Sequence, residues 1–281
     1  MDPMADLGEL TSAADDVTAR LRGIRRLGVA YSGGVDSALL LALAVRALGA
    51  DQVVAVLGVS PSLAAAERLA AHQVAGFIGA PVVEVLTREQ DREAYRSNGP
   101  DRCYHCKDEL FDRIDAEVIA RHGLDAVAYG ENADDARRPD RPGSLAAREH
   151  GVLRPLADAG LDKAAVRRLA RALRLPCADK PAAPCLASRI PHFERVDPAK
   201  LGQVERAEAA VRALGFADSR VRHHGDVARV ELPAGDLLRA VAEPMREDLL
   251  AAVRTAGFRF VALDLAGIQS GAFTLPLVAR G

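Results

Sequence analysis

Hydrophobic residues in the first part of the chain occur in short uninterrupted runs, and the segments between the runs carry apolar residues at helical spacing. A short apolar run is typical of a strand that is buried on both faces of a parallel sheet. Strands that alternate with helices in this way predict an α/β fold, a doubly wound parallel sheet. The predicted strands are 27–31, 53–59, 82–86 and 125–130, and the predicted helices are 6–22, 38–48, 63–78, 107–122 and 161–173.

The chain after the fourth predicted strand has a different character. Residues 133–155 are rich in Arg, Asp, Pro and Gly and predict a long loop, which in a compact domain is usually functional or disordered. Three prolines make 176–184 an extended connector, so we place a domain boundary close to Pro191. We therefore expect a doubly wound domain over 1–190 and a smaller C-terminal α+β domain over 191–281. In the latter, the pattern predicts a helix at 198–214, strands at 219–224, 227–232 and 258–263, and two short helices that divide near Pro244.

Composition narrows the class of protein. The 281 residues are 49% hydrophobic and carry a net charge of -2, which argues against a dedicated nucleic-acid surface. No apolar stretch reaches the roughly eighteen residues of a membrane span, and the N-terminus lacks a signal pattern. We therefore expect a cytoplasmic protein with no membrane partner. Four cysteines are too few for a disulfide framework and are better explained as metal-binding or catalytic residues.

The turn after the first predicted strand has the composition of a phosphate site. Gly33 and Gly34 let the backbone turn sharply and approach an anion, while Ser32 and Ser37 add hydroxyl donors. The following helix contributes the positive end of its dipole. The sequence contains neither a lysine-bearing P-loop nor a Gly-x-Gly-x-x-Gly turn here. We expect an anionic ligand, and the alternative is a tight turn that binds nothing.

The motif Ser-Gly-Gly-Val-Asp-Ser resembles the PP-loop of the N-type ATP pyrophosphatases, which cleave ATP between its α and β phosphates. This resemblance implies that five residues hold pyrophosphate and its magnesium ion. They are Ser32, Gly33, Gly34, Asp36 and Ser37.

Three of the four cysteines lie in chemically suggestive settings. Cys103 and Cys106 form a Cys-x-x-Cys just ahead of a predicted helix, and Cys185 follows prolines and precedes Arg189. Cys177 lies in an apolar setting typical of a small core residue. A closed zinc site with a fourth ligand from Cys177 or His105 is one interpretation. A 4Fe-4S cluster on three cysteines with one open iron is a second, and independent roles with a reactive Cys185 are a third.

A basic stripe is predicted on the strand at 219–224. Period-two alternation places Arg220, Arg222 and His224 on one face and Val221 on the other. This face could bind a phosphate, or it could be a solvated polar face.

Several motifs taken together resemble the LarE family, whose members are ATP-dependent sulfur transferases that help to build the nickel-pincer nucleotide cofactor of lactate racemase. The resemblance runs from about residue 10 to 275, and Cys-Leu-Ala-Ser-Arg is its most specific part. The motifs are Ser-Gly-Gly-Val-Asp-Ser at 32–37, Arg-Cys-Tyr-His-Cys-Lys at 102–107, Gly-Glu-Asn-Ala-Asp-Asp at 130–135, Arg-Pro-Gly at 141–143, Pro-Cys-Leu-Ala-Ser-Arg-Ile-Pro at 184–191 and Arg-Val-Arg-His at 220–223.

The resemblance implies a reaction. ATP adenylates a carboxylate of a pyridinium dicarboxylate mononucleotide and releases pyrophosphate, sulfur then displaces AMP, and a second cycle yields the bisthiocarboxylate. Arg220 and Arg222 are the candidates for the substrate phosphate, and Asp36 and Cys185 for catalysis.

Two forms of the family differ in their source of sulfur. In one form a lone cysteine at the position of Cys185 gives up its own sulfur and becomes dehydroalanine. In the other, a Cys-x-x-Cys joins that cysteine to bind a 4Fe-4S cluster that carries sulfide. Because Cys103 and Cys106 are present, we expect the cluster form, with Cys103, Cys106 and Cys185 as ligands. The resemblance also implies a homohexamer.

Other functions share some of these features. A tRNA thiolase can combine a PP-loop with three cluster-binding cysteines, but it should show a strongly basic surface. An ammonia-using synthetase of the NAD or GMP type needs no paired thiols. A zinc-stapled nucleotide-binding module would bind ATP without releasing pyrophosphate.

Overall fold

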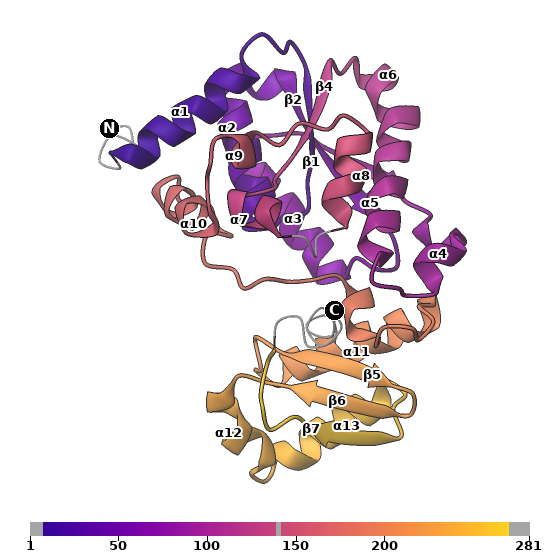
Figure 1. Cartoon of the computed structure of the whole chain (residues 1–281). Coiled ribbons are helices and arrows are strands. Elements are labelled where there is room, and N and C mark those ends of the chain that lie inside the picture. Colours follow the sequence, from indigo (N-terminus) through magenta and orange to yellow (C-terminus); the bar gives the residue numbers. More distant parts are fainter. Residues whose placement is uncertain (1–7, 139–141, 270–281) are drawn as a thin grey trace. The chain divides into compact units, whose positions relative to one another are not determined.

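The computed structural model describes residues 8–138 and 142–269 and divides into two compact units (Figure 1). The first unit contains most of the chain up to Ala183. The second unit contains the chain from Pro184 together with Pro61–Ala64 and Gln90–Arg102. These two short segments distinguish the observed units from a single division near residue 190.

The first unit is built on a four-stranded sheet in which all strands are parallel. Its strand order, β3-β2-β1-β4, shows that the chain returns past β1 to add the last strand at the other edge. The predicted parallel sheet is confirmed, although β1 and β4 end one residue earlier than expected. The strands are β1 (Leu27–Ala30), β2 (Val53–Val59), β3 (Val82–Leu86) and β4 (Ala126–Tyr129).

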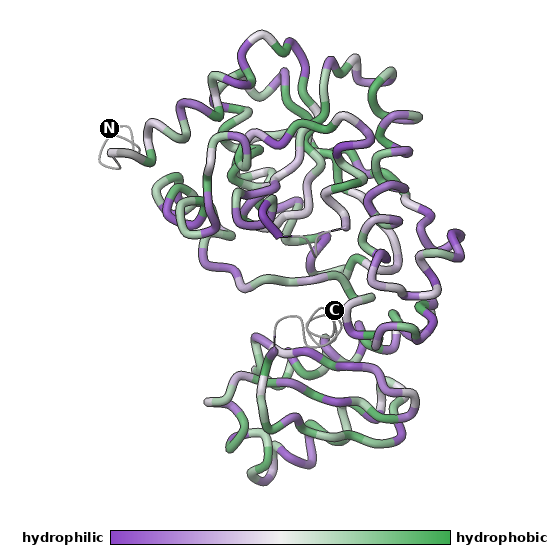
Figure 2. The backbone as a smooth tube through the Cα atoms, viewed as in Figure 1, coloured by the Kyte–Doolittle hydropathy of each residue, from purple (hydrophilic) through white to green (hydrophobic). Residues whose placement is uncertain are grey.

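Helices cover both faces of this sheet (Figure 1). On one face α2 packs against β1 and β2, and α1, α3 and α10 pack against α2. On the other face Phe111, Ile114 and Val118 join a buried cluster with Val56 and Val127. Figure 2 shows that the central strands are mostly hydrophobic. The helices are α1 (Glu9–Leu21), α2 (Val35–Leu48), α3 (Ala65–Ile78), α5 (Arg102–Arg113), which continues as a π-helical segment (Ile114–Ile119) into α6 (Ala120–His122), and α10 (Lys163–Ala172).

The prediction of a long loop at 133–155 is wrong, because this stretch contains two helices and leads into a third. Asn132 begins the first helix by accepting a hydrogen bond from the backbone N–H of Asp135 at 2.9 Å. Ala146 and Ala147 of the second helix are buried in the core. The abundant charges therefore mark the solvent-facing sides of short helices, and Arg141 of the Arg-Pro-Gly motif lies outside the described residues. These helices are α7 (Ala133–Arg137), α8 (Gly143–Glu149) and α9 (Pro155–Asp158).

The second unit is a small α+β structure, as predicted. Its three-stranded sheet has the order β5-β6-β7, with β5 and β6 antiparallel and β6 and β7 parallel. Helix α11 begins at an Asp197 cap, which accepts from the N–H of Lys200 at 2.9 Å, and packs against α13 and β5. The elements are α4 (Glu93–Arg96), α11 (Pro198–Ala213), β5 (Arg220–His224), β6 (Val227–Glu231), α12 (Leu237–Val241), α13 (Met245–Thr255) and β7 (Phe260–Leu263).

Within residues 8–138 and 142–269, the helices are too short or too polar to cross a membrane.

Candidate functional site

The turn between β1 and α2 has the backbone geometry of a phosphate cradle. Gly33 has a φ of 73°, and a Cβ there would lie 2.8 Å from the Cα of Ala71, so only glycine fits. The Ser37 hydroxyl donates to the carbonyl of Gly34 at 3.1 Å and lies 3.2 Å from the Ser32 hydroxyl. The turn is thus closed by its own side chains. The first N–H groups of α2, a helix of 14 residues, lack partners inside the helix and can bind an anion at this end.

The end of β4 comes very close to this turn. A Cβ on Gly130 would lie 2.6 Å from the backbone nitrogen of Ser37 and 2.7 Å from the carbonyl carbon of Asp36. Only a glycine allows the two chain segments to approach so closely. Since β1 and β4 are the neighbours between which the strand order reverses, the turn at 32–37 and the segment at 130–135 lie together at the topological switch point of the sheet.

Asp36 lies at the centre of a polar cluster that connects three parts of the first unit. Its Oδ1 accepts from the Asn132 amide at 3.0 Å, and its Oδ2 accepts from Lys163 Nζ at 2.5 Å. The same amide group of Asn132 also donates to Asp135 Oδ2 at 3.0 Å. The Asp36 side chain is 19% exposed and that of Lys163 is 40% exposed. The cluster is therefore partly open to solvent.

Sequence reasoning missed Lys163. This residue is the first of α10, which begins where Asp162 accepts from the N–H of Ala165 at 2.7 Å. An aspartate cap predicts the start of a helix, and a lysine directly after it would have been the signal. Its role could not be found from spacing alone, because Lys163 and Asp36 lie 127 residues apart in the chain.

The donor atoms around Asp36 fit a magnesium ion. Mg²⁺ prefers hard oxygen ligands and is usually bound through one or two carboxylates together with substrate phosphates. Asp36 offers a partly exposed carboxylate, and Asp135 shares the Asn132 amide with it. The present partner of Asp36 Oδ2 is a flexible lysine ammonium, which a cation could displace without breaking the fold.

A second polar group includes residues from two of the motifs that carry the family resemblance, Lys107 and Glu131. Glu131 accepts from the Ser144 hydroxyl, and Arg154 Nη1 lies 3.5 Å from Glu131 Oε2. Lys107 Nζ lies 4.3 Å from the ring centroid of Tyr129, a cation–π distance. Burial, and after it the neighbouring Glu131 carboxylate, raises the pKa of the Tyr129 hydroxyl well above its usual value. The Cys-x-x-Cys helix, the end of β4 and the start of α8 are thus packed together.

The paired cysteines lie inside a helix and not ahead of it as predicted. Helix α5 begins at Arg102, whose N–H donates to the carbonyl of Gly99 at 3.1 Å. Cys103 and Cys106 are therefore at positions i and i+3 in the first two turns, on one side of the helix. Cys103 is exposed and Cys106 is half-buried. This arrangement allows both thiols to face one ligand.

The other two cysteines differ in setting. Cys177 of the first unit is 2% exposed, and burial raises the pKa of its thiol, so its interpretation as a core residue is confirmed. Cys185 is exposed and belongs to the second unit. A common site for Cys103, Cys106 and Cys185 therefore stays a prediction.

The two arginines predicted to bind phosphate are engaged within the second unit. Arg222 is buried and donates to both oxygens of Glu231, at 3.0 and 2.9 Å, and to the carbonyl of Ser188 at 2.9 Å. Arg220 donates to Asp218 Oδ1 at 2.7 Å. Because Arg222 is buried, the alternative of a solvated polar face does not hold for this residue. A phosphate role for either residue stays a prediction.

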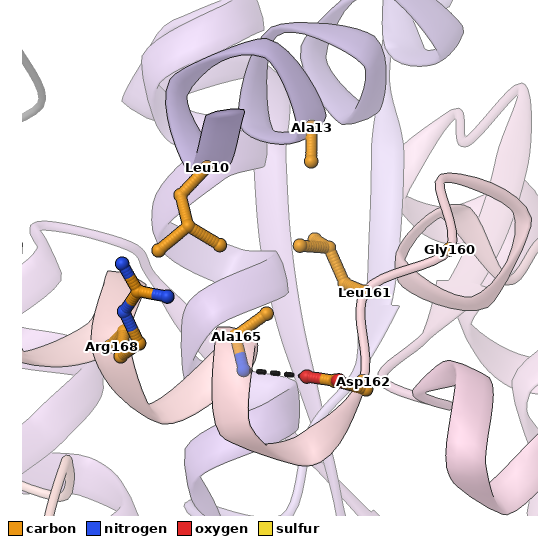
Figure 3. A pocket seen from close by; sticks show the side chains of 7 residues that line it. All are labelled: Leu10, Ala13, Gly160, Leu161, Asp162, Ala165 and Arg168. Atoms are coloured by element: carbon orange, nitrogen blue, oxygen red, sulfur yellow. Dashed lines mark hydrogen bonds between the residues drawn. The ribbon is translucent and has the colours of Figure 1, made fainter. Parts of the chain in front are cut away.

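A pocket of about 340 Å³ lies elsewhere in the first unit (Figure 3). Leu10, Ala13 and Leu161 give it an apolar wall, and Arg168 extends from α10 toward it. Its lining comes from α1, from α10 and from the residues before α10, not from the turn after β1. We therefore assign the chemistry to the turn and its neighbours.

Comparison with known proteins agrees with this assignment. Residues 11–122 match the asparagine synthase family. An uncharacterized protein of Synechocystis sp. is 42% identical over 243 residues, which are 86% of this chain and 90% of that protein. The pyridinium-3,5-bisthiocarboxylic acid mononucleotide synthase of Lactiplantibacillus plantarum is 34% identical over 268 residues, 94% of this chain and 95% of that enzyme. An uncharacterized protein of Methanocaldococcus jannaschii is 26% identical over 241 residues, which are 86% of this chain and 90% of that protein.

The match to the synthase extends over nearly the whole of both chains. The turn after β1 and the cysteine-bearing helix α5 contain two of the motifs from which the resemblance was inferred. The chain belongs to the LarE family of ATP-dependent sulfur transferases.

Proposed function

We propose that this enzyme adenylates the carboxylates of a pyridinium-3,5-dicarboxylate mononucleotide and converts them to thiocarboxylates. The observation that carries the proposal is the junction of the turn at 32–37 with Asp36, Asn132 and Lys163 at the switch point of the sheet. The similarity to a synthase named for the bisthiocarboxylic acid mononucleotide supports the choice of substrate.

The residues around the turn suit the cleavage of ATP between its α and β phosphates. The first amides of α2 and the hydroxyls of Ser32 and Ser37 provide donors for the oxygens of the departing pyrophosphate. Gly33 and Gly34 keep side chains away from that anion. Asp36, with Asp135 beside it, would hold a magnesium ion, which would neutralise part of the phosphate charge. Lys163 would then leave Asp36 and donate to a phosphate oxygen.

Adenylation turns a poor electrophile into a reactive one, because AMP becomes the leaving group. We assign the delivery of sulfur to the cysteines. Cys103 and Cys106, on one side of the first two turns of α5, and Cys185 would bind a 4Fe-4S cluster. When bound, the cluster would supply sulfide at its open iron. If it does not assemble, Cys185 is the candidate to give up its own sulfur. The mononucleotide phosphate is assigned to Arg220 and Arg222, where it would compete with Asp218 and Glu231. A homohexamer in the cytoplasm completes the proposal: the family resemblance implies the hexamer, and the cytoplasmic location is the expectation from the sequence pattern.

The proposal is tested by measuring pyrophosphate and thiocarboxylate separately in anaerobically purified protein. Asp36→Ala should abolish substrate-dependent pyrophosphate release, whereas Asp16→Ala, which removes an exposed carboxylate from α1, should not. Cys185→Ala should lose thiocarboxylate formation, together with iron and acid-labile sulfide if the cluster is present. Mass measurement of the parent after turnover separates the two sulfur sources, since loss of one sulfur mass indicates the sacrificial route. Retained pyrophosphate release in Asp36→Ala would remove the central assignment.

A further inference from the structure

Cys185 ends a run of exposed residues, 181–185, and the turn that follows it is buried or half-buried. Cys185 precedes a 3₁₀-helix (Leu186–Arg189) in which Leu186 is 2% exposed and Ala187 is fully buried. The N–H of Leu186 donates to the carbonyl of Ser62 at 2.9 Å, and that of Ser188 donates to the carbonyl of Cys185 at 3.0 Å. The thiol therefore projects from a turn that is anchored on its buried side.

Arg189 binds the backbone of this turn from within the second unit. Its Nη1 donates to the carbonyls of Pro184 and Cys185, at 2.5 and 3.2 Å, and to the Ser188 hydroxyl at 2.9 Å. The guanidinium is fixed from its other side by Glu208 of α11, whose two carboxylate oxygens accept from Nε at 2.7 Å and from Nη2 at 3.1 Å. Both side chains are about 5% exposed or less. A bidentate pair of this kind fixes orientation as well as position.

Glu208 also connects the turn to the sheet of the second unit. Its Oε1 accepts from the N–H of Val221, at the start of β5, at 3.0 Å. A second buried arginine acts on the same turn, because Arg102 Nη1 donates to the carbonyl of Ala187 at 3.0 Å and to Asn98 Oδ1 at 2.5 Å. Burying a charge is costly. Buried charged groups that all contact one short turn therefore indicate that the turn must keep one particular conformation.

We propose that Glu208 is a positioning residue for Cys185: through Arg189 it fixes the carbonyls of Pro184 and Cys185 and thereby the direction in which the thiol points. This role rests on the proposed function, in which Cys185 takes part in sulfur delivery. An adenylated carboxylate is consumed either by sulfur or by water. A loosened turn lowers the rate of the first reaction and leaves the second unchanged, so the enzyme releases pyrophosphate without forming a matching amount of thiocarboxylate.

The test separates positioning from stability with two variants. Glu208→Gln keeps an acceptor for the N–H of Val221 but leaves the buried Arg189 charge without a carboxylate, so it is expected to lower stability as well. The double variant Arg189→Met with Glu208→Gln removes both buried charges. It leaves without its partner only Arg212, which lies 3.6 Å from Glu208 and is 33% exposed to solvent, so the variant should unfold close to the parent temperature. Glu93→Gln removes an exposed ion pair with Arg195 in the same unit and is the matched control.

Two measurements are made on each variant. Displacement of a reacting group by about 1 Å can lower a rate on the order of a hundredfold, so the yield of thiocarboxylate per pyrophosphate should fall about tenfold or more in the double variant. Amide hydrogen exchange at Leu186 and Ser188 should be about tenfold faster or more, with α11 unchanged. Neither should change in Glu93→Gln.

An unchanged yield in a folded double variant would overturn the proposal, since the pair would then only stabilise the unit. If the parent itself releases no substrate-dependent pyrophosphate, the proposed function has failed, and hydrogen exchange alone decides whether Glu208 fixes the turn. Unchanged exchange at Leu186 and Ser188 overturns the positioning role in either case.

Discussion

Lys163→Met should separate the stability of the first unit from its chemistry. The lost ion pair joins Lys163 Nζ to Asp36 Oδ2 at 2.5 Å, but the two side chains are 40% and 19% exposed. Solvent screens a pair this open, so its loss should cost about 1 kcal/mol at most, or a fall of about 2–4 °C in melting temperature. The effect on adenylation should be larger. If the ammonium moves to a phosphate oxygen as charge develops there, its removal should cost about 3–4 kcal/mol, a loss of 10²–10³ in rate.

The assay is single-turnover pyrophosphate release with saturating ATP, beside thermal unfolding of the same samples. Arg171→Met is the matched control, because Arg171 lies on the same helix and makes an exposed ion pair of 2.7 Å with Asp179. It should show a comparably small change in melting temperature and no change in rate. If Lys163→Met releases pyrophosphate at the parent rate, then Lys163 only neutralises Asp36, and its assignment to the phosphate is wrong.

Two further predictions concern buried and half-buried charges. Arg222→Met removes the bidentate partner of the fully buried Glu231 and leaves it only Arg229, whose Nη2 donates to Glu231 Oε1 at 3.2 Å. An unpaired buried charge costs about 3–5 kcal/mol, so unfolding by urea should show a loss below that figure, and a loss below about 1 kcal/mol would contradict the burial argument. Burial alone would lower the pKa of His150, but hydrogen bonds with two neighbouring aspartates outweigh it and raise that pKa. The imidazolium therefore contributes stability that is complete below pH of about 6.5 and is lost as the pH rises through the folded-state pKa. His150→Gln should lower the free energy of unfolding more at pH 6 than at pH 9, and an equal loss at both would refute the charge pairing.

Local patterns predicted the elements of the fold well where each element is dictated by its own residues. The uninterrupted run at 53–59 predicted β2 with both ends correct, since a strand covered on both faces needs apolar side chains throughout. The prediction of a long loop at 133–155 was wrong, because the residues of this stretch do not by themselves dictate its structure. Its helices are short and amphipathic, and a few buried alanines determine where they pack, so charge and proline content hid the helical pattern.

The candidate site divides in the same way. The turn at 32–37 could be predicted because its glycines, serines and aspartate are consecutive and each has a local reason to be there. Lys163 and Glu208 could not be predicted, because their partners are distant in sequence: Lys163 reaches Asp36 across 127 residues, and Glu208 reaches Arg189 from a different element. Alternation did place Arg220 and Arg222 on one face of a strand. It could not show that Glu231 of the neighbouring strand covers Arg222, since strand periodicity assigns a face but says nothing of what lies on it.

The phosphate turn, which serves adenylation, and the Cys185 turn, which serves sulfur delivery, should tolerate different substitutions. The phosphate turn depends on backbone conformations and close backbone approach, so its sensitive positions are Gly33, where Ala71 excludes a side chain, and Gly130, where the start of α2 excludes one. The Cys185 turn has no such steric requirement, and its conformation depends on buried arginines that donate to its carbonyls. Substitutions that remove the buried charges around the Cys185 turn should therefore impair sulfur delivery while adenylation continues. Substitutions at Gly33 or Gly130 should stop both, because without adenylation there is no acceptor for sulfur.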